Sequence, residues 1–218
     1  MITELLLLRH GKTRGNFEHR YIGRRTDESL DPAGRAELNA PSGFHPEMVF
    51  TSPMKRCLET AELLFPGCDL LTIPEFTEID FGQFEYHTYQ ELNGRADYQA
   101  WIDSGGCLPF PGGESLEQYQ KRVRTGFARM CRIIADSKAE VSGNADEPTT
   151  RIAAVVHGGT IMAILCAFAV PKKDYFSWQT ANGCGYLVRF HCMGPDPEKR
   201  GDPDAFLPES IVVQKEIV

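Results

Sequence analysis

The stretch LLLLRHGKTRGN, residues 5–16, runs four leucines directly into an arginine, a histidine and a glycine. A short, continuous apolar run is typical of a strand that is buried on both faces of a parallel sheet. A signal peptide would also be apolar, but no basic region precedes this run and Glu4 interrupts it. We therefore predict a strand over Glu4–Leu8, with the polar triplet at its carboxyl end.

Short apolar runs alternate with helical patterns along the rest of the chain, which favours an α/β fold. We expect further strands in 47–53, 68–74, 151–159, 185–192 and 210–218, and helices from 32, in 53–64, 88–104, 116–135 and 160–170. Residues 137–149 and 193–208 are predicted loops. The near-continuous apolar run RIAAVV indicates a central strand. The prediction is a three-layer α/β/α sandwich with a mostly parallel central sheet, formed by one domain over residues 1–218.

Charge and composition exclude several classes of protein. The formal net charge of −7 argues against a nucleic-acid partner, which usually needs a basic surface. No segment has the roughly 18 consecutive apolar residues of a membrane helix, so we expect no membrane partner. The seven cysteines form no C-x-x-C pair and indicate reduced thiols and a cytoplasmic location. The six histidines match no metal-binding spacing, so we expect neither a metal nor a cofactor.

Two predicted strands end in a histidine beside glycine: Arg9-His10-Gly11 and His157-Gly158-Gly159. The strand in 47–53 leads into a helix that carries Arg56. Ligands bind at the carboxyl ends of the strands in open α/β sheets. Two histidines and two arginines gathered there would suit a phosphoryl group, because a guanidinium can grip two phosphate oxygens at once.

This pattern also suggests how a phosphoryl group could be transferred. A histidine can act as the nucleophile and form a phosphohistidine, and a second can stabilise the transition state. The leaving alcohol needs a proton, which Glu78, Asp80 or Glu85 in FTEIDFGQFE could supply. One histidine at a strand end is more often structural than catalytic, and only the combination of features favours a reactive site.

Five ordered blocks resemble the histidine phosphatase superfamily, in its phosphoglycerate mutase-like branch. They are LRHGKTRGN, TSPMKRCLETA, TEIDFG, PGGES and VVHGGTI. The resemblance runs from Leu5 to about Tyr186 and implies the phosphoglycerate mutase-like fold with a short helical cap at about 83–112. It also implies His10 as the nucleophile, in a charged pocket formed with Arg9, Arg56 and His157.

The resemblance further implies phosphate contacts from Asn16 and the backbone of Gly158, with Thr13 supporting the loop. Glu78 stands four residues before a glycine, as the family's proton donor does, and is preferred to Asp80 and Glu85, with Asp80 as second candidate. Two departures put the substrate contacts in question. Phe84-Glu85-Tyr86 stands where many members have Trp-Glu-Gly, and the segment after residue 23 is one residue longer.

The predicted activity is metal-independent hydrolysis of a small phosphomonoester. The family's mutases resemble this chain but carry a long basic insertion, whereas residues 79–113 include Arg95 as their one basic side chain. The short cap resembles the α-ribazole phosphatase group, which serves cobalamin assembly. Alternatives are a phosphoglycerate mutase, a broad-specificity sugar-phosphate phosphatase, a protein-phosphohistidine phosphatase and, least favoured, a non-catalytic module that binds phosphorylated ligands. SIVVQKEIV, residues 210–218, is either an edge strand that pairs across a homodimer or a covered strand.

Overall fold

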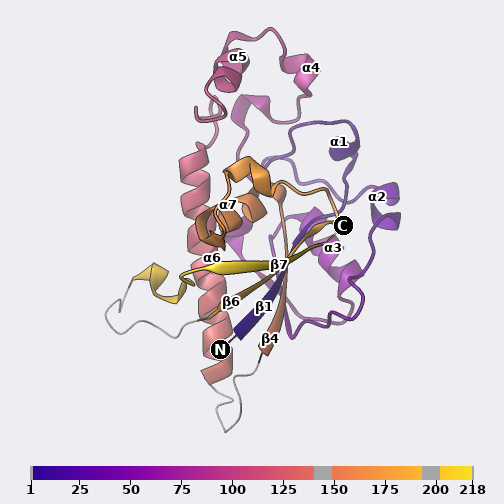
Figure 1. Ribbon diagram of the computed structural model, residues 1–218. Helices are drawn as coiled ribbons and strands as arrows, with labels where there is room; N and C mark the ends of the chain where they lie inside the picture. Colours follow the sequence, from indigo (N-terminus) through magenta and orange to yellow (C-terminus); the bar gives the residue numbers. More distant parts are fainter. Residues whose placement is uncertain (1, 140–148, 193–201, 218) are drawn as a thin grey trace.

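The computed structural model describes residues 2–139, 149–192 and 202–217, and places one seven-stranded sheet at their centre (Figure 1). The strands are β1 (Ile2–Arg9), β2 (Met48–Thr51), β3 (Leu70–Thr72), β4 (Thr149–Val156), β5 (Ala169–Val170), β6 (Gly185–His191) and β7 (Ile211–Ile217). Their order is β3-β2-β4-β1-β6-β7-β5. Only β6 runs antiparallel to its neighbours. The predicted mostly parallel sheet is confirmed.

The first strand is buried on both faces, as its leucines predict. Leu5 and Leu7 belong to one hydrophobic core, and Leu6 and Leu8 belong to a second core on the other face of the sheet. Each of the four side chains is at most 1% exposed. Successive side chains of a strand point to opposite faces, so an unbroken leucine run fits only a strand that lies between two layers.

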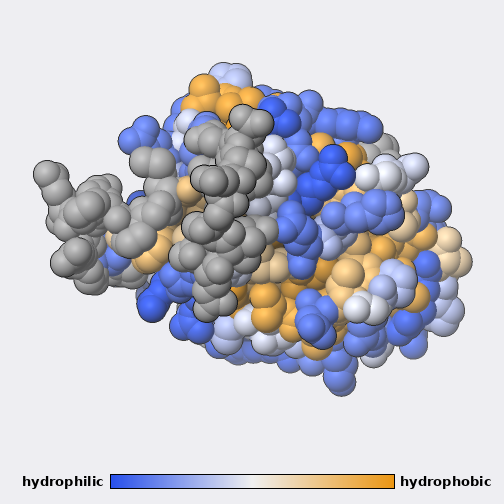
Figure 2. All heavy atoms as spheres, turned by 90° about the horizontal axis from the view of Figure 1, so that it is seen from below, coloured by the Kyte–Doolittle hydropathy of each residue, from blue (hydrophilic) through white to orange (hydrophobic). Residues whose placement is uncertain are grey.

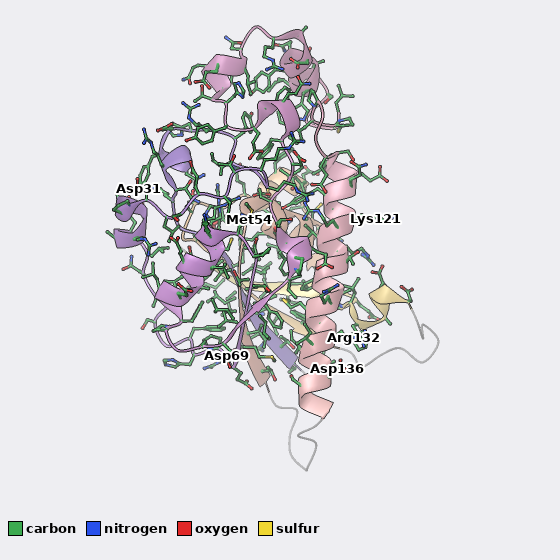
Figure 3. The ribbon with its side chains drawn as sticks, turned by 180° about the vertical axis from the view of Figure 1, so that it is seen from behind. Asp31, Met54, Asp69, Lys121, Arg132 and Asp136 are labelled. Atoms are coloured by element: carbon green, nitrogen blue, oxygen red, sulfur yellow. The ribbon has the colours of Figure 1, made fainter. Side chains whose placement is uncertain are left out.

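Helices cover both faces of this sheet, which confirms the α/β/α layering. The α-helices are α1 (Arg14–Phe17), α2 (Pro32–Ala36), α3 (Lys55–Leu64), α4 (Tyr89–Leu92), α5 (Ala96–Asp103), α6 (Leu116–Ala139) and α7 (Gly158–Phe168). α3 packs on β2 and β4, whereas α7 packs on β1 and against α6. In Figure 3, Lys121 and Asp136 mark the course of α6 from the cap end toward the opposite end of the sheet.

The predicted helix over 88–104 is wrong, because two short helices occupy this segment. α4 begins with a capping box formed by Thr88 and Glu91, and α5 follows after a break at 93–95. Gly94 takes a left-handed φ of +86°, which a glycine adopts without strain and which a continuing helix cannot contain. Together with the 3₁₀ turn Gly82–Phe84, α4 and α5 form the cap above the carboxyl ends of the strands (Figure 1).

Several predicted boundaries shift by a few residues. α3 begins at Lys55 rather than at Pro53, and α6 continues to Ala139 rather than ending at Ala135. The predicted loop at 137–149 therefore begins as helix and ends as the start of β4, and its residues 140–148 lie outside the described residues. Residues 202–208 of the second predicted loop include a 3₁₀ turn, Pro203–Phe206; the part before residue 202 is not described.

The far edge of the sheet is only partly covered. The last two residues of the apolar run 160–170 leave the helix as β5, which pairs with Ile211 and Val212 at the start of β7. Figure 2 shows the end of the molecule opposite the cap, where hydrophobic and hydrophilic residues are interspersed. No helix within the described ranges is long and apolar enough to cross a membrane.

The packing of α6 on the sheet yields a stability prediction. Phe127 is fully buried, and its ring centroid lies 5.5 Å from that of Phe168 in α7 and 5.8 Å from that of Phe190 in β6. Phe127→Ala should lower the free energy of unfolding by about 3–5 kcal/mol, because the cavity loses contacts to both elements. Leu63→Ala on α3, where Leu63 is 45% exposed, should cost less than about 1 kcal/mol. Urea unfolding of both variants tests this, and equal losses would contradict it.

Candidate active site

The parallel pairing of β1 with β4 brings two of the predicted site segments together. Arg9 lies opposite Val156 in the register, so His10 and His157 both follow directly after paired strand ends. The His10 backbone N–H donates to the Val156 carbonyl at 3.0 Å. The two imidazole ring centroids lie 5.2 Å apart, which places both histidines in one site.

His10 has the geometry of a nucleophile. It is 3% exposed, and its Nδ1 lies 2.7 Å from the Gly11 carbonyl oxygen. A carbonyl can only accept, so Nδ1 carries the proton and Nε2 keeps its lone pair. Burial, followed by the charges of Arg56 and Arg9, lowers the pKa of His10 well below its ordinary value. The imidazole is therefore neutral at pH 7 and can attack phosphorus.

Arg56 is a fully buried cation on the first turn of α3. Its Nη1 donates to the Thr26 carbonyl at 2.8 Å and its Nη2 to the Gly23 carbonyl at 3.2 Å. Arg9, at the end of β1, donates from Nη1 to the Thr180 carbonyl at 2.8 Å. These carbonyls fix both guanidinium groups in place.

Both arginines also have spare donors. The Nε atoms of Arg9 and Arg56 are buried and make no hydrogen bond, and within the described residues neither guanidinium forms an ion pair. Buried charges are normally paired, because an unpaired one loses its hydration without compensation. The charge and the donors of this pair therefore suit an anion.

His157 follows β4 and occupies the N-cap position of α7. It is fully buried, and its Nε2 lies 2.8 Å from the Ser52 hydroxyl and 3.5 Å from the Cys57 thiol. Burial, then the charge of Arg56, lowers the pKa of His157 well below its ordinary value. Ser52 orients this histidine, and although it belongs to a recognised block, the sequence alone assigned it no role.

A cavity of about 410 Å³ opens over these strand ends. Of the predicted site residues, Arg9, His10, Asn16, Glu78 and Gly158 line it. Thr13, Arg56 and His157 are fully buried and are not among its lining residues. The rest of the wall includes six aromatic residues: Tyr21, Phe81, Trp101, Phe110, Tyr175 and Phe176. The structure therefore separates a polar, charged floor from an aromatic upper part beneath the cap.

Thr13 and Asn16 form the capping box of α1. The Thr13 hydroxyl accepts from the Asn16 backbone N–H at 3.3 Å, and Asn16 Oδ1 accepts from the Thr13 N–H at 3.1 Å. Asn182 Nδ2 donates to Asn16 Oδ1 at 3.4 Å and to the His10 carbonyl at 3.0 Å. These bonds engage the amide oxygen of Asn16 and leave its NH₂ group for a ligand, which agrees with the predicted phosphate contact.

Glu78 is the carboxylate at the cavity. It is 9% exposed, and its Oε1 accepts from the Tyr119 hydroxyl at 2.8 Å and from the Ile79 backbone N–H at 2.9 Å. Tyr119 lies on α6, 41 residues further along the chain. No motif in the sequence linked it to the acid, because it looks like any other apolar position on the inner face of that helix.

The backbone around Glu78 is held by an arginine from α6. Arg122 Nη1 donates to the Glu75 carbonyl at 2.7 Å and to the Thr77 carbonyl at 2.9 Å, and its Nη2 donates to the Glu78 carbonyl at 3.3 Å. Glu114, from the block PGGES, pairs with the same guanidinium at 2.8 Å. This block therefore fixes the position of the acid without touching the cavity.

The two other carboxylates considered for the acid role do not line the cavity. Asp80 pairs with Arg25 at 2.7 Å and accepts from the Gly82 N–H at 2.9 Å. Glu85 accepts from the Gly23 N–H at 2.9 Å, and burial raises its pKa. Both acids organise neighbouring loops, so the geometry favours Glu78 over either of them.

The glycines after His157 allow a close approach to the start of α7. A Cβ on Gly159 would lie 2.6 Å from Glu78 Oε1 and 2.8 Å from the Tyr119 hydroxyl, whereas one on Gly158 would meet nothing closer than Arg9 Nε at 3.4 Å. The first N–H groups of a helix have no intrahelical acceptor and favour anions. The N-terminus of α7 is thus open to a phosphate beside Arg9.

The described part of the chain contains no group of three or more His, Cys, Asp or Glu side chains placed to hold a metal ion. The expectation of a metal-independent reaction remains a prediction.

A family model of the histidine phosphatase superfamily (branch 1) matches residues 5–203. The chain belongs to this superfamily, so the resemblance drawn from the five sequence blocks is confirmed. In fold, the chain is similar to a phosphoglycerate mutase of Thermus thermophilus, with a TM-score of 0.60 at 26% identity over 99% of this chain and 98% of the other.

Relatives of the chain carry the names of both phosphatases and mutases. A bifunctional protein of Mycobacterium tuberculosis is 32% identical over 137 residues, which cover 59% of this chain and 37% of the relative; the chain thus spans little over a third of the first relatives' length. Phosphoserine phosphatase 1 of Hydrogenobacter thermophilus is 31% identical over 60% of this chain and 65% of its own. A 2,3-bisphosphoglycerate-dependent phosphoglycerate mutase of Corynebacterium kroppenstedtii is 26% identical over 74% and 75%.

Among solved structures, the α-ribazole phosphatase of Shigella flexneri is similar to the chain in fold. Its TM-score is 0.69 at 19% identity, over 100% of this chain and 96% of the other. At this identity the likeness establishes the fold alone.

Replacement of Gly159 tests the packing around the acid. Gly159→Ala should lower kcat by roughly 10²-fold, because the new methyl group displaces Glu78 and Tyr119. Gly158→Ala, whose methyl group meets only ordinary contacts, should lose much less. Steady-state kinetics on a phosphomonoester compares the two variants, and equal losses would contradict the predicted displacement.

The depressed pKa of His10 predicts a pH dependence of stability. The unfolded chain binds a proton at this histidine below about pH 6.5, whereas the folded chain does not until a much lower pH. The free energy of unfolding should therefore fall below pH 6.5, by up to about 1.4 kcal/mol per pH unit from His10 alone. Urea unfolding at pH 7.5, 6.5 and 5.5 should show a weaker dependence for His10→Asn than for the parent.

The exposed His45 provides the matched control. His45→Asn should leave the pH dependence of the parent unchanged. A His10→Asn protein that loses stability as steeply as the parent would show that His10 does not resist protonation.

Proposed function

We propose that this chain is a metal-independent phosphomonoester hydrolase that works through a phosphohistidine on His10. One observation carries the proposal. A buried, neutral imidazole with Nε2 unprotonated lies beside Arg9 and Arg56, and a buried glutamate, Glu78, lines the same cavity. Membership of the superfamily supports it. Nucleophile, anion site and proton donor are the parts that phosphoryl transfer requires.

In the first step, Nε2 of His10 attacks phosphorus while the bond to the alcohol oxygen breaks. Arg9 binds the equatorial oxygens at the cavity, with Asn16 and the Gly158 N–H as further donors, and Arg56 and His157, which are buried beside His10, stabilise the developing charge. Protonated Glu78 gives its proton to the departing alcohol. In the second step, ionised Glu78 takes a proton from water, which attacks the phosphohistidine and releases phosphate and free His10.

The charges around the cavity favour a phosphatase over a mutase. A phosphoglycerate needs a second cationic subsite for its carboxylate. In the cavity, Arg20 already pairs with Glu18 at 2.6 Å and with Glu91 at 3.0 Å. On the cap, Arg95 pairs with Asp97 at 2.7 Å. The described upper part of the cavity thus offers aromatic surface rather than free positive charge.

This surface guides the choice of substrate. The aromatic walls would accommodate an uncharged ring on the alcohol, and we propose α-ribazole 5'-phosphate as the first candidate, in a role in cobalamin biosynthesis. If the chain is a phosphatase, a sugar phosphate or a protein phosphohistidine is an alternative substrate. The alternative activity is that of a phosphoglycerate mutase like the Corynebacterium relative. A non-catalytic binding module has the least support, because both His10 and Glu78 line the cavity.

The predicted partners and location of the protein remain predictions. We expect a small phosphorylated substrate, no nucleic-acid or membrane partner, and a cytoplasmic location. A homodimer would use the outer edge of β7, which β5 covers only at Ile211 and Val212.

Three variants test the proposed roles. His10→Ala should abolish turnover of phosphomonoesters, because it removes the side chain that attacks phosphorus. Glu78→Gln should slow hydrolysis of an alkyl phosphate by about 10²–10⁴-fold, since the amide cannot donate the proton. Asp80→Asn, the control outside the cavity, should retain most of the activity.

The substrate panel should include α-ribazole 5'-phosphate, sugar phosphates and 3-phosphoglycerate. We expect phosphate release from the first at the highest kcat/KM, and no isomerisation of the last with or without bisphosphoglycerate. Full activity of His10→Ala would refute the hydrolase mechanism, and rapid isomerisation of 3-phosphoglycerate would favour the mutase.

A further inference from the structure

We infer that Tyr119 is a positioning residue for Glu78, and that it fixes which carboxyl oxygen carries the proton given to the leaving alcohol. The inference rests on the proposed function, in which Glu78 is the acid. It assigns a specific task to a buried hydroxyl on α6 that belongs to none of the recognised blocks.

Tyr119 ends a short chain of hydroxyl groups. The residue is fully buried, and its hydroxyl lies 2.8 Å from Glu78 Oε1 and 3.1 Å from Thr160 Oγ1 on α7. A phenol has one hydrogen. Because it donates that hydrogen to Glu78, the Thr160 hydroxyl must donate to Tyr119. The direction of both hydrogen bonds is thereby set.

The Tyr119 hydroxyl keeps its proton throughout catalysis. Burial, followed by the charge of Glu78, raises the pKa of Tyr119 well above its ordinary value. Tyr119 is therefore a permanent donor to Oε1, and it is not itself the source of the proton that reaches the substrate.

Two donors converge on one oxygen of Glu78. Oε1 accepts from both Tyr119 and the Ile79 backbone N–H. A proton on Oε1 would point at one of these donors, so the acidic proton belongs on the other oxygen. Within the described part of the chain Oε2 makes no hydrogen bond, and Glu78 lines the cavity. The proton on Oε2 is thus available to the substrate.

The two hydrogen bonds to Oε1 disfavour rotation of the Glu78 carboxyl group. A rotation of 180° would bring the protonated oxygen against the two donors and leave them without an acceptor. Buried donors that lose their acceptor cost free energy, so one orientation is favoured.

The proton balance then involves Glu78 alone. When the phosphorus–oxygen bond breaks, the Oε2 proton moves to the alcohol oxygen and the bonding electrons stay with that oxygen. When water attacks the phosphohistidine, its proton returns to Oε2. The Tyr119 hydroxyl donates to Oε1 in both steps and exchanges no proton with the substrate.

The test compares leaving groups in Tyr119→Phe, which keeps the ring and removes the hydroxyl. Nitrophenolate leaves without a proton, whereas an alkoxide needs one, and kcat/KM reports the steps up to departure of the alcohol. We expect kcat/KM to fall about tenfold for an alkyl phosphate and less than twofold for 4-nitrophenyl phosphate. Tyr98→Phe is the control, because Tyr98 is also buried and its hydroxyl lies 2.8 Å from that of Tyr21. This variant should change kcat/KM for the two substrates by the same factor or not at all.

Thr160→Val provides a second variant, should Tyr119→Phe not fold. It removes the donor to Tyr119 and should produce a smaller effect with the same preference for poor leaving groups. Equal fractional losses with both substrates, or no loss, would overturn the inference. Glu78→Gln distinguishes failure of the acid role of Glu78 from failure of the positioning role of Tyr119. If the loss of kcat/KM in Glu78→Gln does not depend on the leaving group, the acid role is wrong. If that loss depends on the leaving group in Glu78→Gln but not in Tyr119→Phe, only the positioning role is wrong.

Discussion

The parallel pairing of β1 with β4 is the contact on which the site depends. Its register sets Arg9 beside Val156 and so brings His10 and His157 to one edge of the sheet. Leucine and valine side chains on both faces fix this pair between two layers of helices. The reactive groups thereby stand on rigid strand ends rather than on a loop, which is where precise positioning is easiest to maintain.

Burial sets the protonation state of the two site histidines, His10 and His157. An exposed histidine would be partly protonated near neutral pH, but burial and the nearby arginines keep both site histidines neutral. Within the described residues, neither Arg9 nor Arg56 forms an ion pair with a carboxylate. The site therefore has positive charge available for a phosphate. Unpaired cations lower the stability of the folded protein, and this cost is typical of a functional site. Arg122 and Glu114 stabilise the segment that carries the acid, at a distance from the substrate.

The sequence predicted the elements whose pattern is local. The leucine run, the glycines after His157 and the five blocks each indicate their structure within a few residues. Tyr119 could not be predicted, because its partner Glu78 is 41 residues away and only the fold brings them together. The single helix over 88–104 was wrong because amphipathic spacing continued across Gly94, where the backbone turns. Ser52 and Asn182 were missed for the same reason as Tyr119, since each acts on a side chain that is distant in sequence.

In the proposed mechanism, the phosphoryl group is transferred to His10 before water releases it as phosphate. This transfer can be tested most directly by rapid quenching of the Glu78→Gln protein with a phosphomonoester, followed by mass spectrometry under alkaline conditions that preserve phosphohistidine. We expect a phosphoryl group on His10, which accumulates because removal of the base slows its hydrolysis. A phosphoryl group on another residue, or product formation without any phosphorylated protein, would contradict this mechanism.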